Sequence, residues 1–442
     1  MRGAATLWPR GGLWRHADFL KLWTAQGVSQ FGSQISGLAL PLVALYALHA
    51  TAFQVAALGT VEFAPFLLFS LPAGVWVDRL HRRLIMVTAD LGRAVALGSI
   101  PIVAAVGHLT LAQLYVAGFV TGTLTVFFDV SYQSYLPSLV QRSELVDGNA
   151  KLEVTRSIAQ IGGPGVSGLL VGAITAPYAI VADAISFLWS SLWLLAIRRK
   201  ETIPKRTAAS ASMGRELLDG VKYLVGHRYW RGISMSTATF NFSGNVALAI
   251  LIVYMSRRLH LSALQIGLTF SLGSIGGLVA ASFARRIGLR LGVGRTILAG
   301  TIINGLPLFL VPLAPVSYPI PFIAVAFAFV EFGVILYNVS VISLTQALVP
   351  ERLLGRVNAS RRFIVWGMIP LGSLTSGALA TLIGLRPTIF IGVVGCLLAA
   401  VPIALSPVRH VQELPTEAET VPFVEDALLP THAAELSSEA AE

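Results

Sequence analysis

Charged residues are scarce in this 442-residue chain, and their scarcity argues against an ordinary soluble protein. Asp, Glu, Lys and Arg make up 12% of the sequence, against roughly 25% in soluble domains. Hydrophobic residues make up 55%, and the mean hydropathy is +0.73. Long apolar stretches recur along the chain, and dividing them into spans of about twenty residues gives roughly twelve. The chain is therefore predicted to be an integral membrane protein.

Other missing features exclude several kinds of chemistry. The lone Cys396 cannot form an internal disulfide, and the eight histidines have no metal-binding spacing. No Gly-Lys dipeptide occurs, so the chain has no Walker A loop. No apolar core precedes Phe19, so no cleavable signal peptide is expected. We therefore expect neither an enzyme nor a bound cofactor or metal.

Lys and Arg gather in short clusters, nearly all of which would lie on one side of the membrane. With a cytoplasmic N-terminus, the cytoplasmic clusters are Arg2, Arg10, Arg15 and Lys21, then Arg79, Arg82 and Arg83, then Arg142, Lys151 and Arg156, and the segments 198–231, 285–295 and 352–362. On this topology only Arg257, Arg258 and Arg386 face the opposite side of the membrane. Positive charge on alternate loops sets orientation, so a multi-pass protein of the cytoplasmic membrane is predicted, with both termini in the cytoplasm. The net charge of +10 is attributed to topology and anionic lipid, and no nucleic-acid partner is expected.

The apolar stretches predict an all-α membrane protein, because only helices and closed barrels satisfy backbone polar groups in lipid. The expected spans are 19–47, 53–77, 84–106, 111–137, 152–174, 178–197, 229–255, 264–284, 293–313, 320–348, 363–383 and 388–406. They divide into two six-helix bundles, 19–197 and 229–406, with a cytoplasmic N-terminus (1–18), a central loop (198–228) and an acidic tail (407–442). The composition of that tail predicts disorder.

The two bundles are related in sequence. Laying residue 149 on residue 358 aligns Asp129-Val-Ser131 with Asn338-Val-Ser340, and Asn149-Ala with Asn358-Ala. Chance similarity between apolar sequences is the alternative, but the matches include polar loop residues at equivalent positions. A duplication of six spans predicts two bundles around a site at the membrane midplane, the architecture of alternating-access transport.

Several motifs resemble those of the major facilitator superfamily. The loop Gly74-Val-Trp-Val-Asp78-Arg79-Leu-His-Arg82-Arg83 resembles its signature G-x-x-x-D-R-x-x-R-[RK]. Gly162-Gly163-Pro164-Gly165-Val-Ser-Gly168 is similar to the antiporter motif of the fifth helix. Phe127-Phe-Asp129-Val-Ser-Tyr-Gln-Ser-Tyr-Leu-Pro137, Asp147-Gly-Asn149-Ala and Asp183-Ala-Ile-Ser-Phe187 resemble the macrolide-efflux and enterobactin-exporter branch. The resemblance covers residues 15–405 and implies the twelve-helix fold with drug:proton antiport.

This resemblance implies a cytoplasmic gate network. In the family, the loop Asp caps the start of the eleventh helix and the loop Arg pairs with an acid low on the fourth; these positions fall on Asp78, Arg82 and Asp129. Such a network locks the outward-open state, whereas the alternative is that the arginines only set topology. The predicted network is Gly74, Asp78, Arg79, Arg82, Arg83 and Asp129, with Gly74 permitting close helix approach. The second-half copy has Arg285 where the first has Asp78, so the two halves cannot form equivalent latches.

The glycines around Pro164 predict a mobile seam in the fifth span. Gly162, Gly163, Gly165 and Gly168 permit close helix contact, and Pro164 bends the helix. The functional interpretation is a hinge and sliding seam, and ordinary helix packing is the alternative.

Ionisable groups at membrane depth are candidates for proton coupling or substrate binding, because a buried charge is costly and usually functional. Glu62 lies near the middle of the second span and Glu331 near the middle of the tenth, with no basic residue predicted at matching depth. Each could carry the coupled proton or bind a cationic drug, and a structural hydrogen bond is the alternative. Asp90 and Arg93 are expected to form a local pair, and Asp183 to be structural.

The first span is unusually polar. Gln26, Gln30, Ser33 and Gln34 follow helical spacing and so share one stripe. This stripe is predicted to line a central cavity, with interhelical hydrogen bonding as the alternative.

These features together predict a monomeric, proton-coupled exporter of hydrophobic or amphiphilic small molecules such as antibiotics, whose partners are its substrate, protons and the bilayer. Export of a siderophore or secreted metabolite is the alternative within transport. A non-transporting membrane sensor or assembly subunit is the alternative of another class. The buried acids Glu62 and Glu331 favour transport, because a sensor has no need of protonatable groups in its core. The pattern leaves the substrate unnamed and the coupling ion, H⁺ or Na⁺, open.

Overall fold

The computed structural model describes residues 12–77, 80–199, 201, 222, 224–349 and 351–412, and the regular elements within them are helices. Twelve of the described helical segments are long and apolar enough to cross a membrane. The first half contains α1 (Ala17–Leu42, extended by a π-helical turn, Val43–Ala47), α2 (Ala52–Val77), α3 (Arg82–Ala105), α4 (Leu111–Leu139), α5 (Leu145–Ile174) and α6 (Ala176–Leu195). The second contains α8 (Arg228–Leu248) with α9 (Leu251–Arg257), α10 (Ala263–Leu291), α11 (Val293–Gly305) with α12 (Leu310–Leu313), α13 (Pro319–Leu348), α14 (Glu351–Ile383), and α15 (Leu385–Leu398) with α16 (Ala400–Leu405). The predicted all-α fold and its twelve spans are confirmed.

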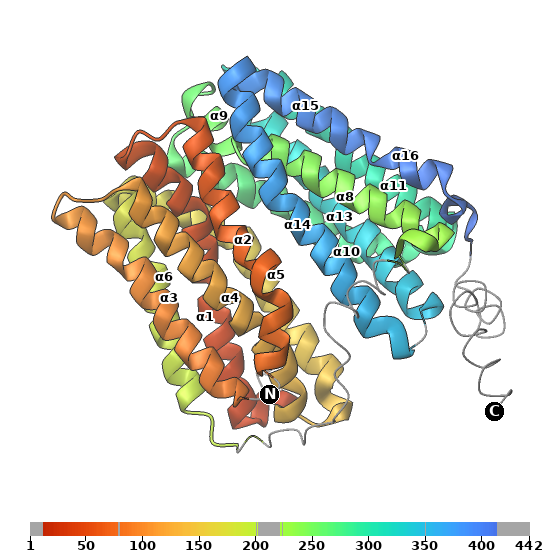
Figure 1. Cartoon of the computed structure of the whole chain (residues 1–442), viewed down its shortest axis with the longest axis horizontal. Coiled ribbons are helices and arrows are strands. Elements are labelled where there is room, and N and C mark those ends of the chain that lie inside the picture. Colours follow the sequence, from red (N-terminus) through yellow and green to blue (C-terminus); the bar gives the residue numbers. More distant parts are fainter. Residues whose placement is uncertain are drawn as a thin grey trace, which may run out of the picture.

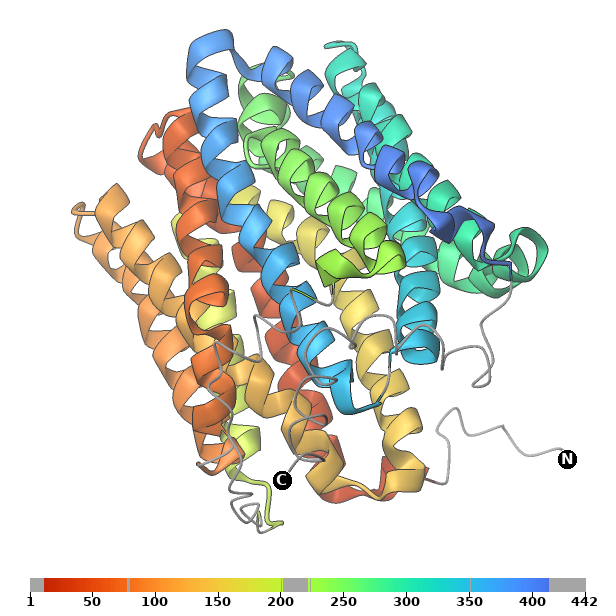
Figure 2. The ribbon, with the colours of Figure 1, turned by 45° about the vertical axis from the view of Figure 1, so that its right-hand side comes forward.

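The helices form two bundles that meet along two helix pairs. α2 packs against α14, and α5 packs against α10 (Figure 1). Figure 2 also shows α14 beside α2. Exchanging the halves converts one pair into the other, as expected if the bundles are structural repeats.

Glycine contacts confirm this pseudo-symmetry at residue level. Gly163 on α5 lies against Gln34 of α1, and Gly372 on α14 lies against Asn245 of α8. Gly163 and Gly372 are related by the same shift that lays residue 149 on residue 358. The same close helix contact is therefore repeated in both halves.

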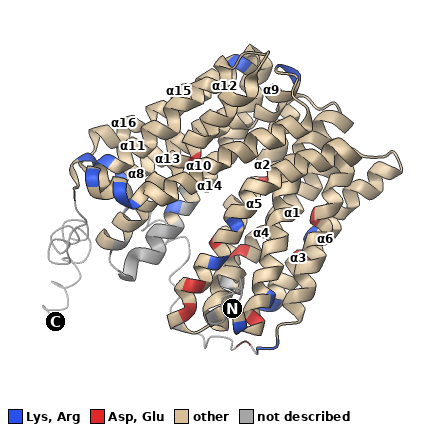
Figure 3. Ribbon diagram, turned by 180° about the vertical axis from the view of Figure 1, so that it is seen from behind, with Lys and Arg blue, Asp and Glu red and all other residues tan. Residues whose placement is uncertain are grey.

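The membrane face at which α1 begins is here called the terminal face. At this face, polar contacts close the end of the first bundle. The Asp18 carboxylate accepts hydrogen bonds from the backbone N–H groups of Arg198 (3.2 Å) and Arg199 (3.1 Å). Glu201 accepts from the first N–H groups of α3, those of Arg82 (3.1 Å) and Arg83 (3.3 Å), and so caps that helix. Figure 3 shows Lys and Arg gathered at helix ends, including those of the terminal face.

The acidic tail begins later than predicted. Residues 407–410 form a 3₁₀ turn, and the side chain of Val408 is fully buried. The N–H of Gly294 donates to the Val411 carbonyl oxygen at 2.8 Å, and Gly294 leaves room for the backbone at Val408. This turn is ordered because α11 begins with glycines that admit a second backbone. The rest of the predicted tail, 413–442, lies outside the described residues.

The apolar cores differ between the two faces of the membrane. Away from the terminal face, one core joins both halves and includes Leu42, Leu58, Leu251 and Tyr254, each at most 1% exposed. At the terminal face the described residues form two separate cores, one in each half. In Figure 1 the halves accordingly touch at the top and diverge towards the end where α1 begins. The molecule is sealed on one face and open on the other.

Candidate functional site

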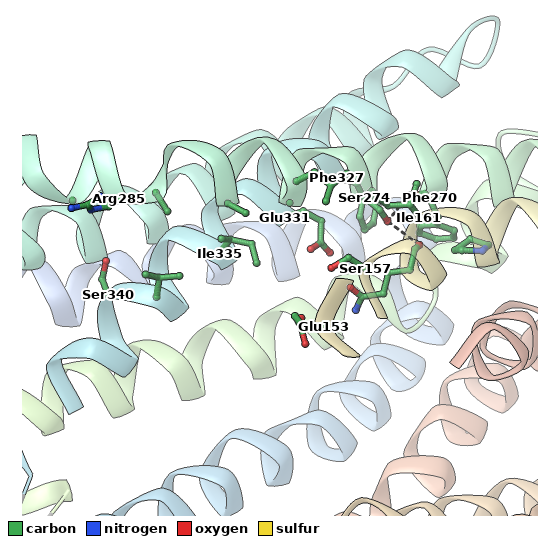
Figure 4. A pocket seen from close by; sticks show the side chains of 18 of the residues that line it. Glu153, Ser157, Ile161, Phe270, Ser274, Arg285, Phe327, Glu331, Ile335 and Ser340 are labelled. Atoms are coloured by element: carbon green, nitrogen blue, oxygen red, sulfur yellow. Dashed lines mark hydrogen bonds between the residues drawn. The ribbon is translucent and has the colours of Figure 1, made fainter. Parts of the chain in front are cut away.

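A cavity of about 1150 Å³ lies between the two halves. α1 and α5 line it from the first half, and α10 and α13 from the second. It runs from Leu38 and Pro164, next to the shared core, to Arg285 and Gln412 at the terminal face. Its walls are largely apolar, with a few polar groups from facing helices (Figure 4). A cavity of this size and lining suits a drug-sized molecule.

Glu331 is one of two acidic residues that line the cavity, the other being Glu153 on α5. Glu331 projects from α13 into the cavity, on the side where α5 contributes Ser157 (Figure 4). Arg156 on α5 is near enough to attract it electrostatically, which corrects the expectation that no basic residue lies at its depth. The expectation failed because α5 begins at Leu145 rather than 152, so Arg156 lies about three turns inside the helix. Arg156 also pairs with the exposed Glu153 at 3.5 Å.

Glu62 occupies a different environment. It is half-buried between α2 and α4, where a Cβ added at Gly118 would lie 3.0 Å from its Cγ. Gly122, one turn further on, leaves room for the Glu62 backbone carbonyl. Glu62 is not among the described residues that line the cavity. The structure therefore does not bring the two predicted acids together.

The polar stripe of α1 is divided between cavity and packing. Gln34 lines the cavity, Gln30 and Ser33 are half-buried, and Gln26 is buried, with no described partner for its Oε1. Gln34 also lies against Gly163 of α5, because this glycine lets the two helices approach closely. The predicted lining role is thus supported for Gln34 and wrong for Gln26 in this state.

The Gly-Pro segment of α5 has two close contacts on two faces. Towards α1, a Cβ at Gly162 would lie 3.3 Å from the ring of Phe31. Towards α10, the N–H of Gly165 donates to Ser271 Oγ at 2.9 Å, and Gly168 lies against the Ala263 carbonyl oxygen. The carbonyl of Pro164 in turn lies against Gly267. The segment therefore forms the α5–α10 seam between the two halves.

The structure describes part of the predicted gate network. Asp78 and Arg79 lie outside the described residues. Arg82 donates from Nη1 to the Ser134 carbonyl oxygen at 3.1 Å, and its Nε lies 3.8 Å from Glu201 Oε1. Arg83 donates to the Ile197 carbonyl oxygen at 2.5 Å. Glu201 was missed because it lies in a basic loop without a motif.

Asp129 and Gly74 are two further members of the predicted gate network. Asp129 is half-buried on α4, the helix that also carries Ser134, and its pairing with Arg82 stays a prediction. A Cβ at Gly74 would meet no described atom within 4 Å. In this state Gly74 therefore makes no close helix contact with a described residue, and that role stays a prediction.

A buried ionic cluster holds the first bundle together. Asp90 and Arg93 form the predicted pair, with Asp90 fully buried. The Arg93 guanidinium lies between the rings of Phe128 (4.4 Å) and Phe187 (4.1 Å), where cation–π attraction stabilises it. Asp183, also buried, accepts from Ser186 Oγ at 3.0 Å.

Two pseudo-symmetric helix bundles around a cavity open to one membrane face define a membrane transporter rather than an enzyme. The described residues contain no group of three or more potential metal ligands. The chain belongs to the Major Facilitator Superfamily, whose family model matches residues 22–373 and 233–433.

Relatives of known sequence and structure agree with that family. The multidrug efflux pump Tap of Mycolicibacterium fortuitum is 25% identical over 337 residues, which cover 73% of this chain and 80% of that protein. Macrolide efflux protein A of Streptococcus pyogenes is 24% identical over 405 residues, covering 90% and 97%. A bacterial homologue of the iron transporter ferroportin, solved in an inward-facing state, is similar with a TM-score of 0.69 at 18% identity, covering 89% and 99%. At that identity the structural likeness concerns the fold.

Proposed function

We propose that this protein exports hydrophobic or amphiphilic small molecules, with a preference for cations, in exchange for protons. The observation that carries the proposal is Glu331 on the deep wall of a largely apolar cavity of about 1150 Å³. A carboxylate in such a wall attracts a cationic group, while the apolar surface accepts generic hydrophobic shapes. The efflux function named for both relatives supports the direction of transport.

The terminal face is proposed to be cytoplasmic. The basic clusters of the sequence adjoin the helix ends of this face, as positive-inside topology requires. The cavity would then be open to the cytoplasm, the state in which an exporter loads substrate. In the opposite state, Asp78, Arg79, Arg82, Arg83 and Asp129 are proposed to close this face, with α5–α10 and α2–α14 as the seams along which the halves rock.

Proton coupling is proposed to arise because Glu331 holds either a proton or a cationic substrate, but not both at once. A proton and a cationic substrate compete for Glu331 when the cavity faces the cytoplasm. Because a ligand shifts a conformational equilibrium only through differential affinity for the two states, the charge on Glu331 links loading to the change of state. The protein is proposed to act as a monomer and without a cofactor.

Transport by the purified protein in proteoliposomes tests this function. Ethidium, a lipophilic cation, should accumulate in vesicles with an acidic lumen when the terminal face is outside. A protonophore should abolish the accumulation, and a sodium gradient should not replace the pH gradient. Uphill accumulation without any ion gradient, or driven by sodium alone, would contradict proton antiport.

A further inference from the structure

A second cavity, of about 210 Å³, lies inside the second bundle, where α8 and α14 face α11 and α13. Part of its lining is polar: Thr237, Asn241, Asn304, Tyr337, Asn338 and Arg361. Tyr337 and Thr237 join α13 to α8 through a hydrogen bond of 2.6 Å between their hydroxyl groups. Asn338 is exposed and marks the mouth of the cavity. α13 separates this cavity from the larger one, which Glu331 faces.

Arg361 brings a positive charge into this cavity. Its guanidinium has five N–H donors, yet its one described hydrogen bond is a long one, from Nη1 to Thr345 Oγ1 at 3.5 Å. The structure places no carboxylate within ion-pair distance of Arg361 among the residues it describes. A half-buried cation without a counter-ion is costly, so this geometry favours the arrival of an anion.

Asn304 supplies an independent sign of a missing ligand. Its side chain is 6% exposed and lines the cavity, and its Oδ1 has no hydrogen-bond partner among the described residues. Buried amides are normally satisfied, because each lost hydrogen bond costs free energy. Turning the amide by about 180° exchanges its oxygen and its NH₂ group, and the NH₂ group is the donor that an anion requires. The cavity thus contains the Arg361 guanidinium, without a counter-ion among the described residues, and the Asn304 amide, with an unpaired oxygen.

The fold does not require these polar groups. The shift that lays residue 149 on residue 358 lays Leu152 on Arg361 and Phe128 on Tyr337. Both first-half residues belong to the apolar core at the terminal face. At these two positions one bundle has Leu and Phe, and the other has Arg and Tyr at an energetic cost. The Arg93 guanidinium that lies against Phe128 is paired with Asp90, whereas Arg361 has no such partner among the described residues. Such a cost points to function rather than to packing.

We infer that this cavity binds the oxyanion of a small carboxylate or phosphate, paired with the Arg361 guanidinium and hydrogen-bonded by Asn304. Planar guanidinium groups match carboxylate and phosphate oxygens in geometry and charge. The volume lies below the range typical of sites for drug-sized ligands, so the anion enters alone or on a short apolar stem. It comes either from a free solute or from the headgroup of an anionic lipid. This site is independent of the proposed export function, because binding is measured without transport.

Equilibrium dialysis of the full-length protein in dodecyl maltoside micelles tests the free-solute source, with radiolabelled benzoate and inorganic phosphate as probes. Thermal unfolding with added phosphatidylglycerol or phosphatidylcholine tests the lipid source. The test variant is Arg361→Leu, which copies the first-half residue and is expected to fold. Asn304→Leu removes the amide. Arg285→Leu, a cation on the wall of the larger cavity, is the matched control.

Benzoate or phosphate should bind the wild type saturably, and Arg361→Leu should weaken binding at least about tenfold, the loss expected when a charged hydrogen-bond partner is removed. Asn304→Leu should weaken it less, and Arg285→Leu should leave it unchanged. If phosphatidylglycerol alone raises the melting temperature, and Arg361→Leu abolishes the rise, the anion is a lipid headgroup. Absence of both effects, or equal effects in the Arg361→Leu and Arg285→Leu proteins, overturns the inference. Should Arg361→Leu fail to fold, Arg361→Gln replaces it under the same criteria.

Discussion

Glu331 and Glu62 are alike in sequence context and unlike in surroundings. Each lies between apolar residues near the middle of a span. Glu331 faces the large cavity, where Arg156 can attract it, while Glu62 lies against the glycines of α4. Because Glu331, unlike Glu62, faces a space that substrate could enter, we propose the coupling role for Glu331 first.

Glu331→Gln is expected to insert normally and to weaken transport of a lipophilic cation by about 10- to 100-fold, since an interaction with a charged group is worth ~1.5–3 kcal/mol. A neutral macrolide should be affected less. Removing the titrating group should also flatten the pH dependence of exchange at equilibrium. Counterflow of both substrates across a pH series measures both effects.

Glu62→Gln is the matched control for Glu331→Gln. It should change the pH profile less, because the α2–α4 contact holds this side chain away from the described cavity. If the Glu331→Gln protein keeps the wild-type pH profile and cation preference, Glu331 is structural. The proton carrier would then have to be sought at Asp129 or Asp183.

Two hydrogen bonds join the halves at the sealed face, opposite the terminal face. The Arg257 Nη2 donates to the Ala50 carbonyl oxygen at 2.7 Å, and Ser256 Oγ donates to the Tyr46 hydroxyl at 3.2 Å. Both bonds join the two halves. Arg257→Gln should weaken the seal by about 1.5–3 kcal/mol, the usual value of a charged hydrogen bond, and shift the population towards opening on that face. Double electron–electron resonance between spin labels on the two halves would measure the shift, and an unchanged distance distribution would contradict it.

At the scale of elements, α5 is the helix that connects cavity, seam and second half. Its glycines bring it close to α1 on one face and to α10 on another. Gly165 and Gly168 contact the facing helix directly, so no large side chain lies between the halves there to obstruct the proposed sliding movement. Gly377 of α14, which lies against Phe53 of α2, repeats the arrangement at the second seam.

Gly168→Val is therefore expected to abolish most transport. The new side chain would clash with the Ala263 carbonyl oxygen and the Leu264 Cα, and overpacking of this kind costs about 1–3 kcal/mol. Gly172→Val is the control, because a Cβ at Gly172 meets no described atom within 4 Å. Drug export by cells expressing each variant at equal level is the measurement. Equal loss in both variants would show that helix propensity, rather than the seam, is responsible.

At the scale of the whole molecule, the unequal cores describe the state that is open to the terminal face in the proposed alternating-access cycle. One shared core seals one face, and two separate cores leave the other open. Ser157 in the cavity should therefore be reachable from the terminal face, while Ser317, which is exposed between α12 and α13, should be reachable from the opposite face.

Cysteine labelling tests this sidedness. Ser157→Cys should react with a membrane-impermeant maleimide in inside-out vesicles and not in intact cells. Ser317→Cys should show the reverse pattern. The native Cys396 is buried and should contribute little background. Labelling of Ser157→Cys from intact cells at the same rate as Ser317→Cys would contradict a terminal face that is cytoplasmic and open.

The sequence by itself determined the features that are written locally along the chain. Hydropathy over about twenty residues predicts a span, so twelve spans, two related halves and the positions of Glu62 and Glu331 could be predicted. The glycines around Pro164 could likewise be identified as a contact segment. Helix ends were predicted less well where amphipathic turns extend a helix beyond its apolar stretch. α5 begins at Leu145 for this reason, so Arg156 lies well inside the helix, near enough to Glu331 to attract it.

The tertiary structure alone decided which face of each helix meets cavity, neighbour or lipid. In a membrane, both the lipid and the bundle interior accept apolar side chains, so the sequence pattern does not distinguish them. That choice depends on contacts between segments far apart in the chain, such as Gly163 with Gln34 and Gly168 with Ala263. In the packed bundle Glu331 and Gln34 face the large cavity, while Glu62 and Gln26 lie in packed surroundings. The packing also gathers Asn304, Tyr337 and Arg361, which lie on three different helices, around one small cavity.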